Sequence, residues 1–161
     1  MMTVLMPVHA EIYSGECGAP QRDNVKWELD TETGVLSITG NGAMLDFQAL
    51  SSGTTNAGWS RKNYDKFIRA VQISDGVTNI GNFAFCQCYS LASITIPESV
   101  MSIGNYAFGE CSSLASITLP ESVNSIGESA FEGCSSLTSI TIPESVNSIG
   151  ESAFHNCNYE V

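Results

Sequence analysis

A block of 23 residues recurs through the second half of the chain, and it restricts the possible folds more than any other feature. Ile-Gly pairs occur at 80–81, 103–104, 126–127 and 149–150. Each pair is followed by Ala-Phe and then by a cysteine, always in the same phase. Repeats of about 20–50 residues are typical of solenoids, in which each unit buries its apolar face against the next. The phase therefore predicts a stack of similar coils.

Each unit reads L-x-x-I-x-I-P-E-S-V-x-x-I-G-x-x-A-F-x-x-C and divides into two halves. In the first half, alternation predicts a strand with Ile94 and Ile96 facing inward. Ser93 and Thr95 then point outward. Proline ends the strand, because it lacks the N–H that the ladder needs. The second half is expected to return along the opposite side as short strands, turns or 3-10 segments. Gly104 is expected to supply a tight or left-handed bend there, beside a neighbouring coil.

The domain organisation follows from where this phase begins. It can be traced back to Ile68, so we expect repeats over residues 66–161, as about four coils with the last incomplete. Coils that pair their strands at about 4.8 Å predict a right-handed parallel solenoid dominated by β structure. Residues 11–65 lie outside the phase and are expected to form an N-terminal β cap over the first coil. Alternating apolar residues around the turn at 30–34 predict a β-hairpin in this cap.

The first ten residues are mostly apolar and have a pattern of their own. Val8 and Ala10 fit the small residues that precede a signal-peptidase site. We interpret residues 1–10 as the remnant of a signal peptide, which would imply export. The alternative is an apolar N-terminus that packs on the first strand.

Charge is distributed unevenly between the two parts. The net charge is −11 and the pI about 4.3. All Lys and Arg residues lie between Arg22 and Arg69, so residues 70–161 contain nine acids and no base. This balance excludes nucleic acid and anionic membrane surfaces as partners, because both attract positive charge. No apolar run reaches the roughly 20 residues that a membrane span needs, so we expect no membrane insertion.

No enzyme signature is present, and we expect no catalytic residue and no cofactor. The sequence lacks a P-loop and a Gly-x-Ser-x-Gly motif. The acids after the strands form a single ladder: Asp75, Glu98, Glu121 and Glu144. Such a ladder offers no matched acid and base. It is interpreted as a solvated acidic edge, with bridging calcium as the alternative.

Four of the six cysteines recur with the repeat, at Cys88, Cys111, Cys134 and Cys157. Their column is apolar and faces inward, so buried free thiols that act as small hydrophobic groups are expected. Disulfides within the column would require the parallel side chains to reorient. A disulfide between Cys17 and Cys86 is a more plausible alternative than a disulfide within the column, since both residues lie outside the column.

Two short motifs resemble zinc half-sites, Cys86-x-Cys88 and His155-x-Cys157. The phase places them three coils, or about 14 Å, apart. Zinc ligands lie about 2.0–2.3 Å from the ion, so the two motifs cannot share one. The same separation excludes a Cys–His nucleophile pair. We therefore expect no metal site, and His155 is expected to be exposed.

The unit resembles the 23-residue leucine-rich repeat of BspA-like surface proteins, over residues 66–157. The upstream segment also resembles the cap of that family, with Gly15-Glu16-Cys17-Gly18 followed by Trp27 and by Gly34-Val35-Leu36-Ser37-Ile38-Thr39-Gly40. The resemblance implies a leucine-rich-repeat solenoid with its parallel strands on the concave side. It also implies a secreted or cell-surface, non-enzymatic protein used in adhesion, with extracellular-matrix glycoproteins and plasma proteins as ligands. No family motif marks the binding residues.

The outward face of the strands is the expected recognition surface, because solenoids present a broad open sheet. The candidate binding residues are Arg69, Gln72, Ser93, Thr95, Ser116, Thr118, Ser139 and Thr141. Trp, Tyr and Arg dominate tight interfaces, and this face has almost none. Weak contacts multiplied by avidity suit it better. The alternatives are a structural spacer within a larger surface protein, and an ice or polysaccharide surface bound by the Ser-x-Thr ladder.

The repeat pattern stops at the end of the sequence. The column that holds leucine in earlier units holds Glu160. The last half-coil is then expected to expose Ile149, Phe154 and strand edges. This predicts fraying, self-association through the uncapped C-terminal coil, or a fragment of a longer array.

Overall fold

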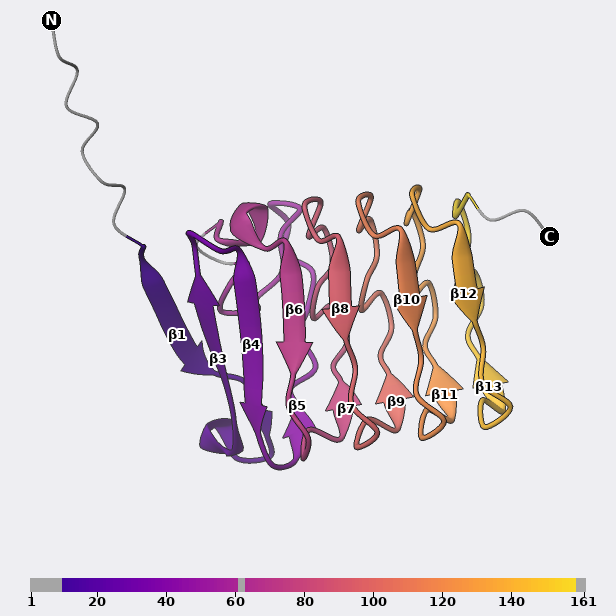
Figure 1. Cartoon of the computed structure of the whole chain (residues 1–161), viewed down its shortest axis with the longest axis horizontal. Coiled ribbons are helices and arrows are strands. Elements are labelled where there is room, and N and C mark those ends of the chain that lie inside the picture. Colours follow the sequence, from indigo (N-terminus) through magenta and orange to yellow (C-terminus); the bar gives the residue numbers. More distant parts are fainter. Residues whose placement is uncertain (1–9, 61–62, 159–161) are drawn as a thin grey trace, which may run out of the picture.

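The computed structural model describes residues 10–60 and 63–158, and it shows a solenoid built almost entirely of β structure (Figure 1). The predicted signal-peptide remnant lies, except for Ala10, outside the described residues. The front row of strands contains β1 (Ile12–Glu16), β3 (Val25–Asp30), β4 (Val35–Gly40), β6 (Ala70–Ile73), β8 (Ser93–Thr95), β10 (Ser116–Thr118) and β12 (Ser139–Thr141). The second row contains β7 (Asn79–Ile80), β9 (Ser102–Ile103), β11 (Ser125–Ile126) and β13 (Ser148–Ile149).

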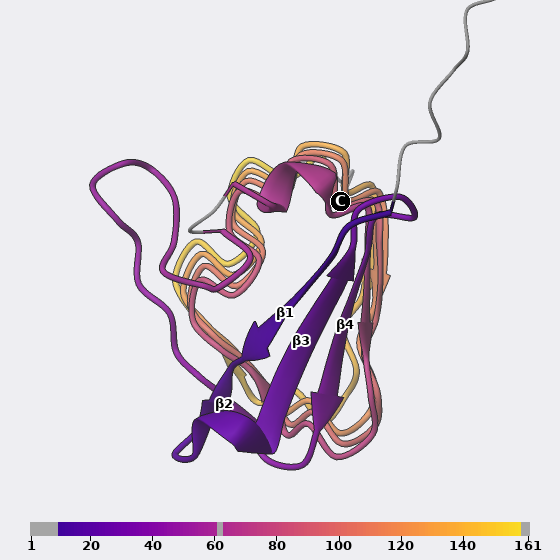
Figure 2. The same cartoon turned by 90° about the vertical axis from the view of Figure 1, so that its left-hand side faces the viewer.

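The repeat phase sets the register of both rows. Ile117 pairs with Ile140 between β10 and β12, and Ile126 pairs with Ile149 between β11 and β13. Each pair is one repeat apart, and the strands are parallel. Figure 2 shows the solenoid from its cap end. In each coil the chain runs down along the front row and up along the opposite side, and successive coils lie farther from the viewer. The coil is right-handed, which confirms the prediction and follows the usual hand of parallel crossovers.

The hydrogen-bonded front sheet is not continuous. Strands β1, β3, β4, β6 and β8 form one sheet in that order, whereas β10 and β12 form a separate two-stranded ladder. The second row crosses the same position without a break, in the order β7, β9, β11 and β13. Figure 1 shows β8 and β10 side by side despite the missing ladder. The second row therefore maintains the stack where the front row is interrupted.

The cap contains the predicted hairpin, and it is joined to the repeats by main-chain pairing. Strands β3 and β4 are antiparallel partners, and β1 adds to the outer edge of β3. Strand β4 then pairs in parallel with β6, with Leu36 opposite Val71 and Ile38 opposite Ile73. Strand β4 is thus the first strand of the parallel sheet. A smaller pair, β2 (Gly18–Ala19) with β5 (Ala43–Met44), and two 3-10 turns, η1 (Arg22–Asn24) and η2 (Asp65–Phe67), complete the cap.

An aromatic ladder forms the core on the return side. Phe85, Phe108 and Phe131 are fully buried, and their rings stack at centroid distances of 5.5 and 5.2 Å. The ladder begins in the cap, because Trp59 stacks on Phe85 at 5.7 Å. The Trp59 indole N–H donates to the carbonyl of Ala84 at 2.9 Å, which satisfies its polar atom inside the core. Trp59 thus stacks on the phenylalanine of the first coil, as each phenylalanine stacks on that of the next coil.

The structure corrects the expected role of Gly104. Its backbone does not have a positive φ; the left-handed positions on the return side are Tyr106 and Glu110 in that coil. Gly104 is needed for a different reason, since a Cβ there would lie 2.6 Å from the backbone nitrogen of Asn82 in the preceding coil. The glycine lies beside a neighbouring coil, as expected, and its role there is to let the two backbones approach closely.

Candidate functional site

The outward side chains of the front strands form one polar surface, which we call the strand face. Ser93 and Thr95 are exposed on β8, and the equivalent Ser and Thr residues of β10 and β12 are exposed in the same way. Gln72 is exposed on β6 and lies opposite Thr95. The structure therefore brings all the predicted columns to one surface, with Thr118 directly opposite Thr141.

Register extends this strand face onto the cap. The row that contains Thr95 and Gln72 continues through Ser37, Glu28 and Ser14 on β4, β3 and β1. The sequence analysis missed these residues, because the cap lies outside the 23-residue phase. Alternation along β3 does show that Glu28 points outward, but only the pairing of β4 with β6 shows that it lies on the same surface as the repeats.

Charge on the strand face is concentrated at its cap end. A hollow of about 430 Å³ between β1 and β3 is lined by Glu16, Lys26 and Glu28 together with Ser14 and Thr39. The outward positions of β8, β10 and β12 are hydroxyl groups without charge. The face thus combines a charged patch on the cap with an uncharged Ser/Thr field on the repeats.

Arg69 lies at the edge of the strand face, just before β6. Its backbone N–H donates to the carbonyl of Gly34 at 2.8 Å, and its carbonyl accepts from the N–H of Ala92. A Cβ at Gly34 would lie 2.8 Å from Cγ of Arg69, so the aliphatic stem packs closely on the hairpin turn. The exposed Arg69 therefore joins the cap to the repeats, as does Gln72, which lies opposite Ser37 of β4.

A groove of about 340 Å³ opens on the strand face where the front ladder is interrupted. Thr95 and Glu98 from one coil and Thr118 and Pro120 from the next line it. Two predicted residues, Thr95 and Thr118, thus meet at one hollow. Backbone groups that are not committed to a sheet ladder can bond other polar groups.

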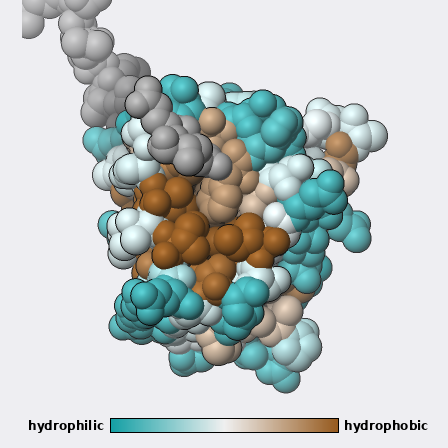
Figure 3. Space-filling model, turned by 90° about the vertical axis from the view of Figure 1, so that its right-hand side faces the viewer, coloured by the Kyte–Doolittle hydropathy of each residue, from teal (hydrophilic) through white to brown (hydrophobic). Residues whose placement is uncertain are grey.

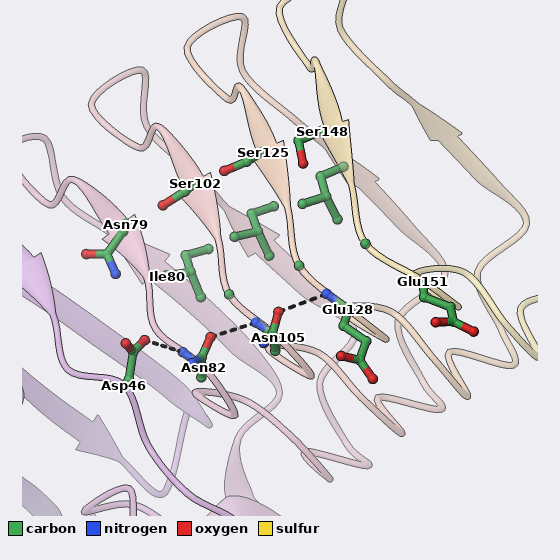
Figure 4. Close-up of a pocket in the computed structure, with 15 residues that line it drawn as sticks. Asp46, Asn79, Ile80, Asn82, Ser102, Asn105, Ser125, Glu128, Ser148 and Glu151 are labelled. Carbon is green, nitrogen blue, oxygen red and sulfur yellow. Dashed lines mark hydrogen bonds between the residues drawn. The ribbon is translucent and has the colours of Figure 1, made fainter.

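A second, larger groove of about 540 Å³ runs along the return side, beside the second row of strands (Figure 4). Its floor contains Gly104, Gly127 and Gly150, where a side chain would collide with the preceding coil. Asp46, Asn82 and Asn105 lie in a line, and each accepts a backbone N–H from the following coil through its Oδ1 atom, at 2.7–2.9 Å. Because these oxygen atoms already bind backbone, we interpret the line as a support for the stack.

The thiol column agrees with the prediction of buried free cysteines. Cys88, Cys111 and Cys134 are buried, Cys157 is partly buried, and each is a free thiol. The thiols of Cys111 and Cys134 donate to the carbonyls of Phe85 and Phe108, both at 3.1 Å. Burial raises the pKa of Cys88 and Cys111 far above its ordinary value. These thiols remain neutral and therefore act as packing groups.

Cys17 and Cys86 are also free, so the structure does not contain the disulfide that was the alternative for this pair. Burial raises the pKa of Cys17 to about 12, and burial together with the charge of Glu110 raises that of Cys86 to about 11. His155 is exposed, with its Nδ1 atom 3.6 Å from Oε1 of Glu132. Among the described residues, no group of three or more His, Cys, Asp or Glu side chains is placed to hold a metal ion.

The acid ladder after the front strands is exposed throughout, at Asp75, Glu98, Glu121 and Glu144.

In residues 10–60 and 63–158, no helix is long and apolar enough to cross a membrane.

Comparison with known proteins gives a consistent result. The sequence profile of the BspA type leucine rich repeat region matches residues 62–160, in six copies. The chain is similar to a solved leucine-rich repeat protein from Eubacterium ventriosum, with 25% identity and a TM-score of 0.64, over 86% of this chain and 40% of that one. It is also similar to a leucine-rich repeat protein of T. pallidum, with 29% identity and a TM-score of 0.58, over 84% of this chain and 65% of that one.

A third solved structure, a leucine-rich repeat protein from Bacteroides ovatus, has 28% identity and a TM-score of 0.57 over 85% of this chain and 39% of its own length. The chain therefore spans less than two thirds of the length of each of these proteins. No curated protein matches it.

Proposed function

Because the chain belongs to the family of BspA-type leucine-rich repeat proteins, we propose that it is a non-enzymatic binding module of a secreted or cell-surface protein. Its ligand is a protein, and the extracellular-matrix and plasma glycoproteins are the class to test first. Contact takes place on the strand face.

The observation that carries this proposal is the continuity of the strand face. A row of outward side chains, exposed except for the half-buried Ser37, runs from Ser14 of β1 through the cap to Thr95 of β8, and β10 and β12 extend it in the same phase. Regular repeats give an extended surface that a protein ligand can contact over several coils. The charged patch at the cap adds orientation, because charge complementarity contributes to specificity and association rate.

The chemistry of the face favours weak contacts. Hydroxyl groups hydrogen-bond a partner, but they contribute less binding energy than the Trp, Tyr and Arg residues of tight interfaces. Arg69 is the exception among the predicted residues. Several weak contacts on one array gain affinity from their effective concentration, so the proposal includes binding by avidity in arrays with more coils. The greater length of the Eubacterium ventriosum and Bacteroides ovatus proteins is consistent with this idea.

The test measures binding of the 161-residue chain to immobilised fibronectin and fibrinogen. The variant Thr95→Lys, Thr118→Lys, Thr141→Lys places three long charged side chains in the middle of the strand face. The matched control, Met101→Lys, Asn124→Lys, Asn147→Lys, adds the same charge in one exposed column on another side of the coils. We expect saturable binding that the first variant loses and the control retains.

Other results would favour the alternatives. Absence of binding by all three proteins up to high micromolar concentrations would favour a structural spacer. Equal loss in both variants would indicate an effect of net charge and not of the strand face. The interrupted ladder between β8 and β10 makes the hydroxyl array uneven, which disfavours a match to the lattice of ice or of a crystalline polysaccharide.

A further inference from the structure

The groove on the return side is lined by polar groups that the fold leaves free. Figure 4 shows its two walls: Asn79, Ser102, Ser125 and Ser148 form one row, and Asp46, Asn82, Asn105, Glu128 and Glu151 form the other. Among the residues that the structure describes, none hydrogen-bonds the hydroxyl of Ser102, the hydroxyl of Ser125 or the carboxylate of Glu128. All three groups lie in coils that have a neighbouring coil on each side, and they are available to a ligand.

The amide groups of Asn82 and Asn105 are each held in one orientation. Their Oδ1 atoms accept backbone N–H groups of the following coil at 2.7 and 2.9 Å. Their Nδ2 atoms are left as donors, and no group in the described part of the chain accepts from them. The stack thus fixes one free donor in each of these coils, and a ligand would not have to order these side chains on binding.

The groove also has the size and the floor of a ligand site. Its volume of about 540 Å³ lies within the usual range of about 300–1,000 Å³. Gly104 and Gly127 lie in its floor, where the close approach of neighbouring coils admits no side chain. Because glycine lets another molecule approach the backbone closely, a flat ring can lie between the two walls.

The character of the lining restricts the ligand to polar molecules without negative charge. Figure 3 shows a hydrophobic patch over the last coil, where Ile142 and Ile149 are exposed. The groove lining consists instead mainly of hydroxyl, amide and carboxylate groups. Its charged residues are all acids, and residues 70–161 contain no Lys or Arg. An anionic ligand would therefore be repelled.

The spacing of the coils distinguishes two kinds of extended polar chain. The second-row strands pair in parallel from β7 to β13, so equivalent groups recur along the groove about every 4.8 Å. An extended peptide advances about 3.3 Å per residue, so neither one nor two residues match the distance between coils. A sugar ring that is linked through equatorial bonds at C1 and C4 is nearly as long as one coil is thick. A chain of such rings would meet equivalent groups in successive coils.

We propose that this groove binds a linear, uncharged glycan with β-1,4 linkages, with one sugar ring beside each coil. Sugar hydroxyls both donate and accept hydrogen bonds, so they match walls in which amide groups donate, carboxylates accept and serine hydroxyls do either. None of the lining residues is aromatic, so hydrogen bonds provide most of the affinity and each ring contributes little. The site lies apart from the strand face, and the proposal does not rest on protein binding there.

NMR of the isotope-labelled 161-residue chain, with cellohexaose as the added ligand, tests the proposal directly. We expect saturable chemical-shift changes at residues 79–82, 102–105 and 125–128, and none at the front strands. Residues of four successive coils line the groove, so affinity should rise from cellobiose to cellotetraose and level off at cellohexaose. Sodium chloride should not change the affinity, because the ligand is uncharged.

Two matched sugars and a peptide test the choice of ligand. Maltohexaose has the same composition as cellohexaose but α-linkages, which curl the chain away from the line of the coils. The cellouronate hexamer keeps the β-1,4 linkage and replaces each hydroxymethyl group with a carboxylate. Both should bind more weakly than cellohexaose, by about tenfold or more. Hexalysine should not displace cellohexaose at high salt, where its attraction to the acids is screened.

Paired substitutions locate the site on the molecule. Ser102→Leu with Ser125→Leu fills the groove and should abolish binding. The control, Ser93→Leu with Ser116→Leu, makes the same change on the front strands of the same two coils and should bind as the parent chain does. Ser102→Ala with Ser125→Ala removes only the hydroxyls and should weaken binding about tenfold. Urea unfolding checks that each variant is folded.

The proposal is overturned if cellohexaose causes no shift changes up to its solubility limit, or if the changes fall on the front strands. It is also overturned if maltohexaose or cellouronate binds as tightly as cellohexaose, or if both leucine pairs lose binding equally while folded. Displacement of cellohexaose by hexalysine at high salt would overturn it as well, since the ligand would then be a basic peptide.

Discussion

At the scale of single residues, the turns on the return side adopt left-handed backbone mostly at residues other than glycine. One position of each coil is held by Phe83, Tyr106, Ser129 and Ser152, with φ between 50° and 57°. A second is held by Gln87, Glu110, Gly133 and Asn156, with φ between 58° and 73°. A non-glycine residue in this region costs about 1–2 kcal/mol. The stack tolerates the cost because each turn is tied by hydrogen bonds to the next coil, such as Gln87 N–H to Gly109 O at 2.7 Å.

Gly133 shows that glycine is accepted at the second position, so we expect Glu110→Gly to stabilise the protein. Relief of the left-handed strain should exceed the added entropy of the unfolded chain, for a net gain of about 0.5–1 kcal/mol. Urea unfolding measures the change. Glu110→Ala is the matched control, since it removes the same side chain and keeps the strain. Equal stability of the two variants would contradict the explanation.

At the scale of the structural element, the distance between coils depends on the glycine column. Gly81, Gly104, Gly127 and Gly150 each lie where a Cβ would meet backbone of the preceding coil or of the cap at 1.8–2.6 Å. Neighbouring backbone cannot move aside as a flexible side chain can. The column therefore fixes the approach of the second-row strands, and it also forms the floor of the groove on the return side.

We expect Gly104→Ala to destabilise the protein by at least about 1–3 kcal/mol, which is the usual range for overpacking. Gly109→Ala provides the comparison, because its Cβ would meet Sγ of Cys86 at an ordinary 3.4 Å. Gly109 also lacks a positive φ, so its replacement should change the free energy of unfolding by less than about 0.5 kcal/mol. Thermal and urea unfolding of both variants measure the difference, and similar losses in the two would show that the coil contact is not the cause.

At the scale of the whole molecule, the stack concentrates thiols in one core. Cys17 and the column of Cys88, Cys111 and Cys134 are held in apolar surroundings, and burial raises the pKa of Cys17, Cys88 and Cys111. In the unfolded chain these thiols ionise near the ordinary value of 9.0. The folded state therefore binds more protons than the unfolded state in mildly alkaline solution.

This difference predicts a loss of stability above about pH 9. A group whose pKa is raised on folding contributes its full stabilisation below the unfolded value, and the contribution falls as pH rises towards the folded value, which is about 12 for Cys17. Each fully buried thiol should lower the free energy of unfolding by up to about 1.4 kcal/mol per pH unit in this window. Urea unfolding in reducing buffer at a series of pH values measures the slope. Cys17→Ala should make it shallower, and an unchanged slope would count against the thiols as the cause.

Much of the repeat region can be predicted from sequence because its environment is periodic. Ile117 and Ile140 pair as expected, the Ala-Phe column is buried, and the cysteine column is a set of free thiols. In a stack, the neighbours of one coil are copies of itself, so a side chain that repeats in phase repeats its contacts. The outward Ser and Thr columns of the strand face follow from the same alternation.

The cap could be predicted only in part. Its hairpin is visible as alternation on both sides of a turn, and β3 and β4 confirm it. The pairing of Leu36 with Val71 is not visible, because these residues are 35 positions apart and no second copy of that step exists. The stacking of Trp59 on Phe85 is equally hidden, since one indole in an irregular segment has no periodic equivalent.

The sequence by itself thus determined the solenoid, its register and the composition of its strand face, because a 23-residue phase acts through contacts between identical neighbours. Only the tertiary structure decided that β4 begins the parallel sheet, that the front ladder is interrupted between β8 and β10, and that the strand face continues onto the charged cap. Only the structure, too, showed that Ile142 and Ile149 are more exposed than the equivalent residues Leu119 and Ile126 of the preceding coil. The physical reason is the same in each case: these features arise where a coil meets something other than a copy of itself, and such contacts are specified by packing in three dimensions.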